Sequence, residues 1–198
     1  MKTLQLRRVV VTGLGALTNI GKDVDSTWKA LLEGRSGISR MTAFEQDASW
    51  TVNIAGQIRD FDYTERFDER DAKRVDPTAL FAMWTGSEAA EDCGLDFTAG
   101  DPYSRGVAIG SGIGGVQTME EQKTKLVLNG PRKVSPFTVP KLMINAAAGN
   151  LSILLNLRGA NTATATACAS GAHSIGSAYN LIQLGQADVM VAGGSEAA

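Results

Sequence analysis

A cysteine between an alternating segment and a helical one is the strongest candidate for chemistry in this chain. Residues 161–167 read NTATATA, an alternation of period two that predicts a short buried strand. Cys168 follows directly, and apolar residues from Ile175 to Ile182 then recur at helical spacing before Gly185, the expected C′ glycine. The pattern therefore predicts that Cys168 lies on a strand-to-helix turn, at or next to a helix N-terminus.

This position favours a nucleophilic sulfur, because free backbone N–H groups and the positive end of a helix dipole stabilise a thiolate. The same N–H groups could hold a carbonyl oxygen that becomes negative during attack on a thioester or acyl group. The competing interpretation of Cys168 is a buried, inert cysteine. The helix that follows is rich in small residues, which are tolerated where other backbones pack tightly, so we expect it to be central.

Cysteine and histidine residues are few. Cys93 and Cys168 are the two cysteines and lack a CxxC arrangement, so neither a disulfide scaffold nor a metal site is predicted. Cys93 is expected to be a buried residue at a helix end, without a chemical role. His173, the single histidine, lies about 140° around a helix from Cys168, so we expect a hydrogen-bonded structural residue.

Composition excludes several functional classes. The chain has 198 residues, of which 43% are hydrophobic, enough for one core or two small ones. Its net charge of -2 gives no sign of a nucleic-acid partner, and no run of about 20 apolar residues predicts a membrane span. The segment MKTLQLRRVVVTG does not resemble a signal peptide, so a cytoplasmic location is expected.

The first part of the chain alternates predicted strands and helices. Residues 8–13, RVVVTG, predict a buried strand, and residues 53–58 predict an edge strand. Two helices have start and stop signals. The first helix is capped by Asp25 and Ser26 and stops at Gly34, and its apolar face consists of Trp28, Leu31 and Leu32. The second helix starts at Asp76 and Pro77 and stops at Gly94, and its apolar face consists of Leu80, Phe81 and Trp84.

The second part continues this alternation. Residues 106–111 predict a strand, and Gly110, Gly112 and Gly115 after it satisfy G-x-G-x-x-G. One interpretation is a dinucleotide-binding site, but the signal is weak because no second parallel strand ending in an acidic residue follows. The alternative is that the glycines let the backbone pass close to the central helix. The remaining predictions are a loop over 134–140, a helix over 141–157 and a buried strand over 187–192. Together they predict a mainly parallel sheet with helices on both faces.

Several segments resemble one enzyme family. TACASGAHSIG, residues 166–176, and ADVMVAGGSEA, residues 187–197, are similar to the active-site region of the β-ketoacyl-acyl carrier protein synthases, particularly the elongating type II enzymes of fatty acid synthesis. RRVVVTGLGALTNIG, residues 7–21, resembles the start of those enzymes, and GSGIGG occurs in them in this form. The resemblance implies an α/β, thiolase-like fold, and we expect residues 1–198 to form its N-terminal half, a mixed, mostly parallel sheet flanked by helices, with the C-terminal half absent.

The resemblance also implies roles for individual residues. Cys168 would accept the acyl chain, and Ile113 would line and gate the acyl pocket. Phe137 would lie near that pocket, followed by Thr138 where the family often has a second aromatic residue. Basic residues would dock the acidic carrier protein, although composition alone favours a solvated charged face. These candidates are Arg70, Lys73, Arg74, Arg132 and Lys133.

In the resembled enzymes, an acyl group moves from carrier protein to cysteine, and a carbanion from decarboxylated malonyl thioester then attacks it in a Claisen condensation. Two histidines and a lysine assist from the second half, so we expect this half alone not to condense and to self-associate through the face it exposes. The expected partners are acyl carrier protein, acyl and malonyl thioesters and a second copy in a homodimer, with no metal or cofactor. The alternatives are a polyketide ketosynthase, a non-catalytic acyl-binding or interaction half-domain, and a nucleotide-binding module.

Overall fold

The computed structural model describes residues 5–197, and a three-stranded parallel sheet lies at its centre. The strand order is β4 (Asn161–Thr162), β3 (Arg105–Gly110), β5 (Val189–Gly194). β3 pairs with β5 along its whole length, from Arg105 opposite Val189 to Gly110 opposite Gly194. Every residue of β3 is buried, because it has a neighbour on both edges and helices on both faces.

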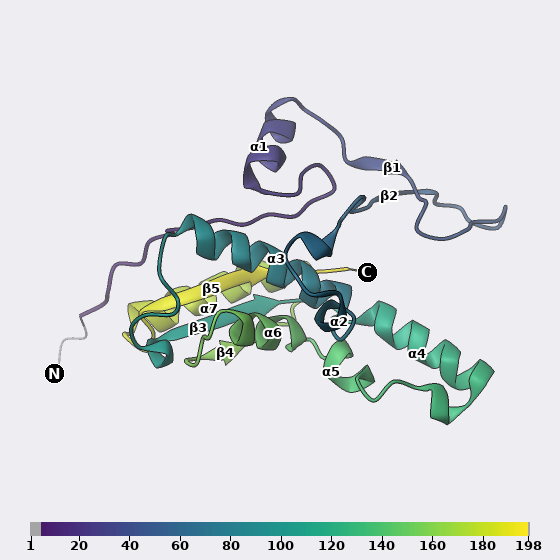
Figure 1. Ribbon diagram of the computed structural model, residues 1–198. Helices are drawn as coiled ribbons and strands as arrows, with labels where there is room; N and C mark the ends of the chain where they lie inside the picture. Colours follow the sequence, from purple (N-terminus) through teal and green to yellow (C-terminus); the bar gives the residue numbers. More distant parts are fainter. Residues whose placement is uncertain (1–4, 198) are drawn as a thin grey trace.

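Helices cover both faces of this sheet, as predicted (Figure 1). Val107 and Ile109 point to one face and pack in a core with α3 (Pro77–Asp92) and α6 (Ala146–Leu154). Leu151 of α6 is completely buried there. The opposite face of β3 carries Gly110 and is covered by α7 (Ser170–Gln183), which also packs on β5.

The strongest sequence signals are found where they were predicted. Asp76 is the N-cap of α3, accepting a hydrogen bond from Thr78 N, and Pro77 is the first helical residue. The helix ends at Asp92 with Cys93 as its C-cap. Cys93 is half-buried rather than buried, and Gly94 has a positive φ of 66°. The N-cap and C′ rules therefore located this helix correctly.

The predicted helix over 141–157 is wrong, because two helices share that segment. α5 (Thr138–Leu142) is followed by its C-cap Met143, whose extended ψ of 138° interrupts the hydrogen-bond ladder before α6 begins. The predicted loop over 134–140 is also partly wrong. Pro140 lies in the first turn of α5, where its missing N–H leaves no intrahelical bond unmade. α4 (Val116–Asn129) and η3 (Pro131–Lys133) connect β3 to this region.

The N-terminal segment forms a separate layer outside α3 (Figure 1). It contains α1 (Val24–Leu32) and an antiparallel hairpin of β1 (Ile38–Arg40) and β2 (Ile54–Gly56), the predicted edge strand. η1 (Tyr63–Glu65) and α2 (Glu69–Ala72) lead back to α3, and η2 (Pro102–Ser104) precedes β3. Glu88 of α3 anchors this layer, because its carboxylate accepts from Ala16 N and Val24 N, each at 2.8 Å.

Two predictions for this layer are wrong. Residues 8–13 form no strand, and Val11 is 79% exposed. The cap of α1 is Asp23 rather than Asp25 or Ser26, and the apolar face of the helix is exposed, with Trp28 at 60%. A periodic pattern of apolar residues shows that one face of a helix or strand is suited to burial, but it does not show which other element covers that face. Within residues 5–197 nothing covers the apolar side chains of residues 8–13 or the apolar face of α1.

None of the helices in residues 5–197 has both the length and the apolar content needed to cross a membrane.

Candidate active site

Cys168 lies on the turn that leads into α7. The helix begins at Ser170 with Ala169 as its N-cap, so the predicted position of the cysteine next to a helix N-terminus is confirmed. The strand before it is shorter than predicted, because β4 pairs with β3 only through Asn161 and Thr162 and is exposed. The buried strand predicted up to residue 167 is therefore wrong, since the backbone leaves the sheet to make the turn.

The turn is strained and is held by one buried hydroxyl group. Ala167 has a φ of 51°, in the left-handed region that side chains disfavour. The hydroxyl of Ser170 accepts a hydrogen bond from Thr166 N at 2.8 Å and donates one to the Ala167 carbonyl at 2.6 Å. These two bonds hold the backbone on both sides of the strained residue and fix the position of Cys168. Sequence reasoning assigned no role to Ser170, although serine is common at helix starts.

α7 approaches the sheet through small residues. A Cβ at Gly194 would lie 2.8 Å from the Cα of Gly171, so β5 and α7 are in backbone contact. The buried residues of α7 are accordingly Ser170, Ser174 and Ala178. The larger residues of the predicted apolar face point outward, with Ile175 54% and Tyr179 45% exposed. The expectation that close backbone packing requires small residues is confirmed, but only for one side of the helix.

A cavity of about 660 Å³ opens beside Cys168. Its walls come from the loop after β3, the turn before α7 and the segment after β5, all at the carboxyl ends of parallel strands, where α/β proteins bind ligands. Cys168 is exposed, which excludes the interpretation of a buried, inert cysteine. The lining residues are Gly110, Ser111, Gly112, Ile113, Ala167, Cys168, Ser170, Gly171, Gly194, Ser195 and Glu196.

The structure brings only some of the candidate pocket residues together. Ile113 lines the same cavity as Cys168 and is 56% exposed. Phe137 and Thr138 do not line it. Phe137 instead lies beneath Arg74, whose guanidinium carbon is 5.8 Å from the ring centroid.

The glycine-rich loop is explained by close packing. A Cβ at Gly110 would lie 2.5 Å from the Ser170 carbonyl carbon, and one at Gly115 would lie 2.8 Å from the Leu142 Cα. Gly114 has a φ of 75°. These contacts support the alternative interpretation of the G-x-G-x-x-G pattern, in which the missing side chains allow backbones to meet.

His173 has the hydrogen bond that was predicted for it, since its Nδ1 lies 2.7 Å from the Thr166 hydroxyl oxygen. The bond joins α7 to the turn that carries Cys168. Among residues 5–197, no group of three or more histidine, cysteine or acidic side chains could hold a metal ion.

The basic candidates occupy two places. Lys73 and Arg74 follow α2 and are ion-paired with its acidic residues, Lys73 to Glu69 at 2.6 Å and Arg74 to Asp71 at 3.3 Å. The hydrogen bond from Lys73 to Glu69, with their opposite charges, raises the pKa of the lysine. Arg70 lies within α2 itself, whereas Arg132 and Lys133 are exposed in η3, past the end of α4.

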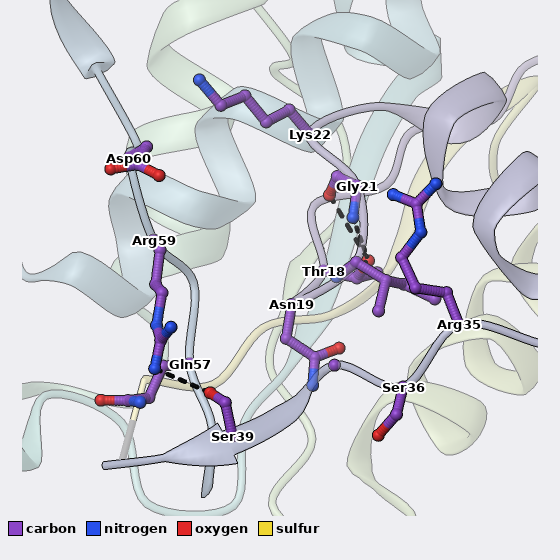
Figure 2. A pocket seen from close by; sticks show the side chains of 12 residues that line it. Thr18, Asn19, Gly21, Lys22, Arg35, Ser36, Ser39, Gln57, Arg59 and Asp60 are labelled. Atoms are coloured by element: carbon purple, nitrogen blue, oxygen red, sulfur yellow. Dashed lines mark hydrogen bonds between the residues drawn. The ribbon is translucent and has the colours of Figure 1, made fainter. Parts of the chain in front are cut away.

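A second hollow, of about 350 Å³, lies between the hairpin and the segment before α1 (Figure 2). Three cationic side chains border it, but Figure 2 shows Lys22, Arg35 and Arg59 pointing in different directions. Arg35 is paired with Glu33, and Arg59 donates to the Ser39 hydroxyl. The charges do not converge and the lining contains no cysteine, so the cavity at Cys168 is the better candidate for chemistry.

Residues 6–198 match the family model of the β-ketoacyl synthase N-terminal domain. The chain is 48% identical over 192 residues to 3-oxoacyl-[acyl-carrier-protein] synthase 2 of Vibrio harveyi and 43% identical over 193 residues to the enzyme of that name from Staphylococcus aureus strain COL. The alignments cover 97% and 98% of this chain but 46% of each relative. The chain thus spans about half the length of the relatives it matches.

Solved ketosynthase structures have the same fold. A chain from the complex of a type II polyketide acyl-carrier protein with its ketosynthase superposes with a TM-score of 0.81 at 27% identity, covering 97% of this chain and 52% of that one. The ishigamide ketosynthase/chain length factor gives 0.88 at 24% identity, covering 98% and 48%. The predicted thiolase-like α/β fold is confirmed.

Proposed function

The chain belongs to the β-ketoacyl synthase family, and on that premise we propose that it acts in a 3-oxoacyl-[acyl carrier protein] synthase of fatty acid elongation, with Cys168 as the nucleophile. One observation carries the proposal. The sulfur is exposed in a cavity of about 660 Å³, on a strained turn next to the N-terminus of a helix of 14 residues. That combination suits a reactive thiolate and leaves room for a chain attached to it.

The step assigned to these residues is acyl loading. The Cys168 thiolate attacks the carbonyl carbon of an acyl thioester, and the carbonyl oxygen takes up the negative charge. As the carbonyl re-forms, the bond to the carrier's sulfur breaks, and the carrier leaves as a thiolate that takes up a proton. The acyl group is then a thioester of Cys168. Condensation with malonyl thioester is assigned to the whole enzyme, including the remaining half of the relatives' length.

The proposed partner is an acidic acyl carrier protein. Arg70, Lys73 and Arg74 around α2, with Arg132 and Lys133 in η3, would steer and orient it, and salt would weaken their contribution. α2 lies close to the helix that follows the candidate pocket residue Phe137, since Lys141 of α5 donates to the Lys73 carbonyl at 3.3 Å. Lys73, one of the basic candidates, therefore lies near the segment that runs from η3 through α5 to α6.

A polyketide ketosynthase is the second candidate, favoured by the structural likeness to a ketosynthase bound to its carrier protein. The sequence supports fatty acid elongation more strongly, because identity to synthase 2 enzymes is 43% to 48%, against 27% for that ketosynthase complex. A homodimer and a cytoplasmic location stay predictions. The exposed apolar face of α1, which includes Trp28, supports self-association.

Loading from two carrier proteins tests the proposal. The chain is incubated with the same acyl group on a fatty acid carrier protein or on a polyketide carrier protein, and intact mass is followed over time. We expect an acyl adduct that forms faster from the fatty acid carrier and is absent in Cys168→Ala. Faster loading from the polyketide carrier would favour the second candidate, and no adduct from either would reject both.

A further inference from the structure

The segment that follows β5 is fastened across three elements. Ser195 N donates to the Gly110 carbonyl at the end of β3 at 3.0 Å, and the Ser195 hydroxyl donates to the Thr78 carbonyl in α3 at 2.6 Å. Gln117 in α4 donates through its amide to the Ala197 carbonyl at 2.9 Å. Residues 195–197 are therefore held in place independently of Glu196, whose side chain projects from a fixed backbone.

The Glu196 carboxylate binds the loop that carries Ile113. Its Oε2 accepts from Gly112 N at 2.7 Å, and its Oε1 accepts from the Ser111 hydroxyl at 3.1 Å. The Ser111 hydroxyl oxygen accepts in turn from Gly114 N at 2.9 Å, and Ser111 is buried. One carboxylate thus holds the backbone on both sides of Ile113, directly through Gly112 and indirectly through Gly114. Hydrogen bonds to an ionised acceptor are stronger than neutral ones.

The part of this loop before Gly114 needs such an anchor, because its own residues give it little rigidity. Ile113 lies between two glycines, which restrict the backbone least of all residue types. The Ile113 side chain is 56% exposed, so packing does not fix it either. Glu196 and Ile113 both line the cavity that contains Cys168. The Thr78 hydroxyl donates to the Gly114 carbonyl at 3.2 Å and holds the loop after Ile113, whereas Glu196 is the group that holds Gly112 directly before it.

We propose that Glu196 is a positioning residue that sets the shape of the acyl-binding cavity by holding the Ser111–Gly114 loop, and thereby determines which acyl chains load onto Cys168. The inference rests on the proposed function, because it assumes that Cys168 takes an acyl chain. Glu196 itself does not touch the reacting atoms; its effect passes through Ile113.

The first test measures the loop without any catalysis. Amide hydrogen exchange at Gly112 and Gly114 is compared in the wild-type chain, Glu196→Ala, Glu196→Gln and the control Glu120→Ala, which changes an exposed carboxylate on α4. Loss of the carboxylate should raise exchange at both glycines about tenfold or more in E196A. E196Q, which keeps an acceptor for Gly112 N, should stay close to wild type, as should E120A. Unchanged exchange in E196A would overturn the inference.

The second test measures selectivity. Loading of Cys168 is timed with acyl thioesters of short, medium and long chains, each over a range of concentrations. E196A should change the concentration dependence of loading and reduce the differences in loading rate between chain lengths. E196Q should restore the wild-type preference. An unchanged length preference in E196A, with wild type loading normally, would overturn only this inference. A wild-type chain that takes no acyl group would overturn the proposed function and this selectivity role with it.

Discussion

Gly110, the last residue of β3, lies directly against Ser170, the first residue of α7, so that a Cβ at Gly110 would be 2.5 Å from the Ser170 carbonyl carbon. The contact sets how closely α7 approaches the sheet. Since the turn carrying Cys168 is bonded to the Ser170 hydroxyl, it also sets where the sulfur lies relative to the cavity.

Gly110→Ala is expected to destabilise the fold by about 1–3 kcal/mol, because the new methyl group meets backbone that cannot move without shifting α7. Gly176→Ala is the matched control, since a Cβ there meets nothing within 4 Å. That change should stabilise α7 by roughly 0.5–1 kcal/mol. Urea denaturation measures both. Equal stability of the two variants would contradict the packing described for β3 and α7.

Ser170→Ala removes the two hydrogen bonds that hold the strained turn. Its hydroxyl is buried, so we expect a loss of about 1–3 kcal/mol and slower alkylation of Cys168 by iodoacetamide. Ser177→Ala, at an exposed position of the same helix, should change neither. Thermal unfolding and the alkylation rate are the two measurements. A variant that reacts as fast as wild type would show that the turn does not depend on Ser170.

The cap of α1 gives a pH dependence. Hydrogen bonds from the side chain and the backbone N–H of Ser26 lower the pKa of Asp23 below its usual value. The ionised form is therefore favoured by folding: its contribution is complete above the unfolded pKa and is lost as pH falls through the folded pKa. Asp23→Ala should cost about 1 kcal/mol at neutral pH.

Asp23→Asn separates the cap from its charge. Asparagine keeps an acceptor for Ser26 N, so stability at neutral pH should stay close to wild type. Its stability should fall less than that of the wild type between neutral pH and the acid range where Asp23 is protonated. Denaturation curves at several pH values report the difference, and parallel pH profiles of wild type and Asp23→Asn would refute the assignment.

The proposed docking residues should act through charge. The triple variant Arg70→Glu, Lys73→Glu, Arg74→Glu is expected to load acyl groups from carrier protein at least about tenfold more slowly at low salt. The deficit should shrink in high salt, because screening removes the wild-type advantage. Lys125→Glu, which breaks a surface ion pair on α4, is the control. A deficit that is independent of salt would point to damaged structure instead.

Local signals predicted the elements that position the site. Asp76 with Pro77 located the start of α3, and Gly185, with a φ of 72°, follows α7 as its C′ glycine. Cys168 was placed correctly because the change from alternation to helical spacing happens within a few residues of it. These features depend on neighbours in the sequence, and that is why they could be predicted.

The features that were missed depend on contacts between distant residues. Glu196 binds Gly112, 84 positions away, and no local pattern distinguishes its carboxylate from a solvated one. The apolar period of α7 likewise did not predict that the side of the helix with small residues would pack on the glycines of the sheet. As a result Ile175 is exposed. Met143, which interrupts the predicted long helix, is an ordinary helix former, so the break is set by tertiary packing.

The most direct test of Cys168 as the acyl acceptor is peptide mapping by mass spectrometry after the chain has been incubated with a carrier protein that bears an acyl group. We expect an acyl increment on the peptide that contains Cys168, none on the peptide with Cys93, and none at all in Cys168→Ala. Iodoacetamide labelling in parallel shows that the sulfur is accessible in the same sample. If Cys168 takes the label but never the acyl group, or if the acyl group is found on Cys93, then Cys168 is not the residue that accepts the acyl chain.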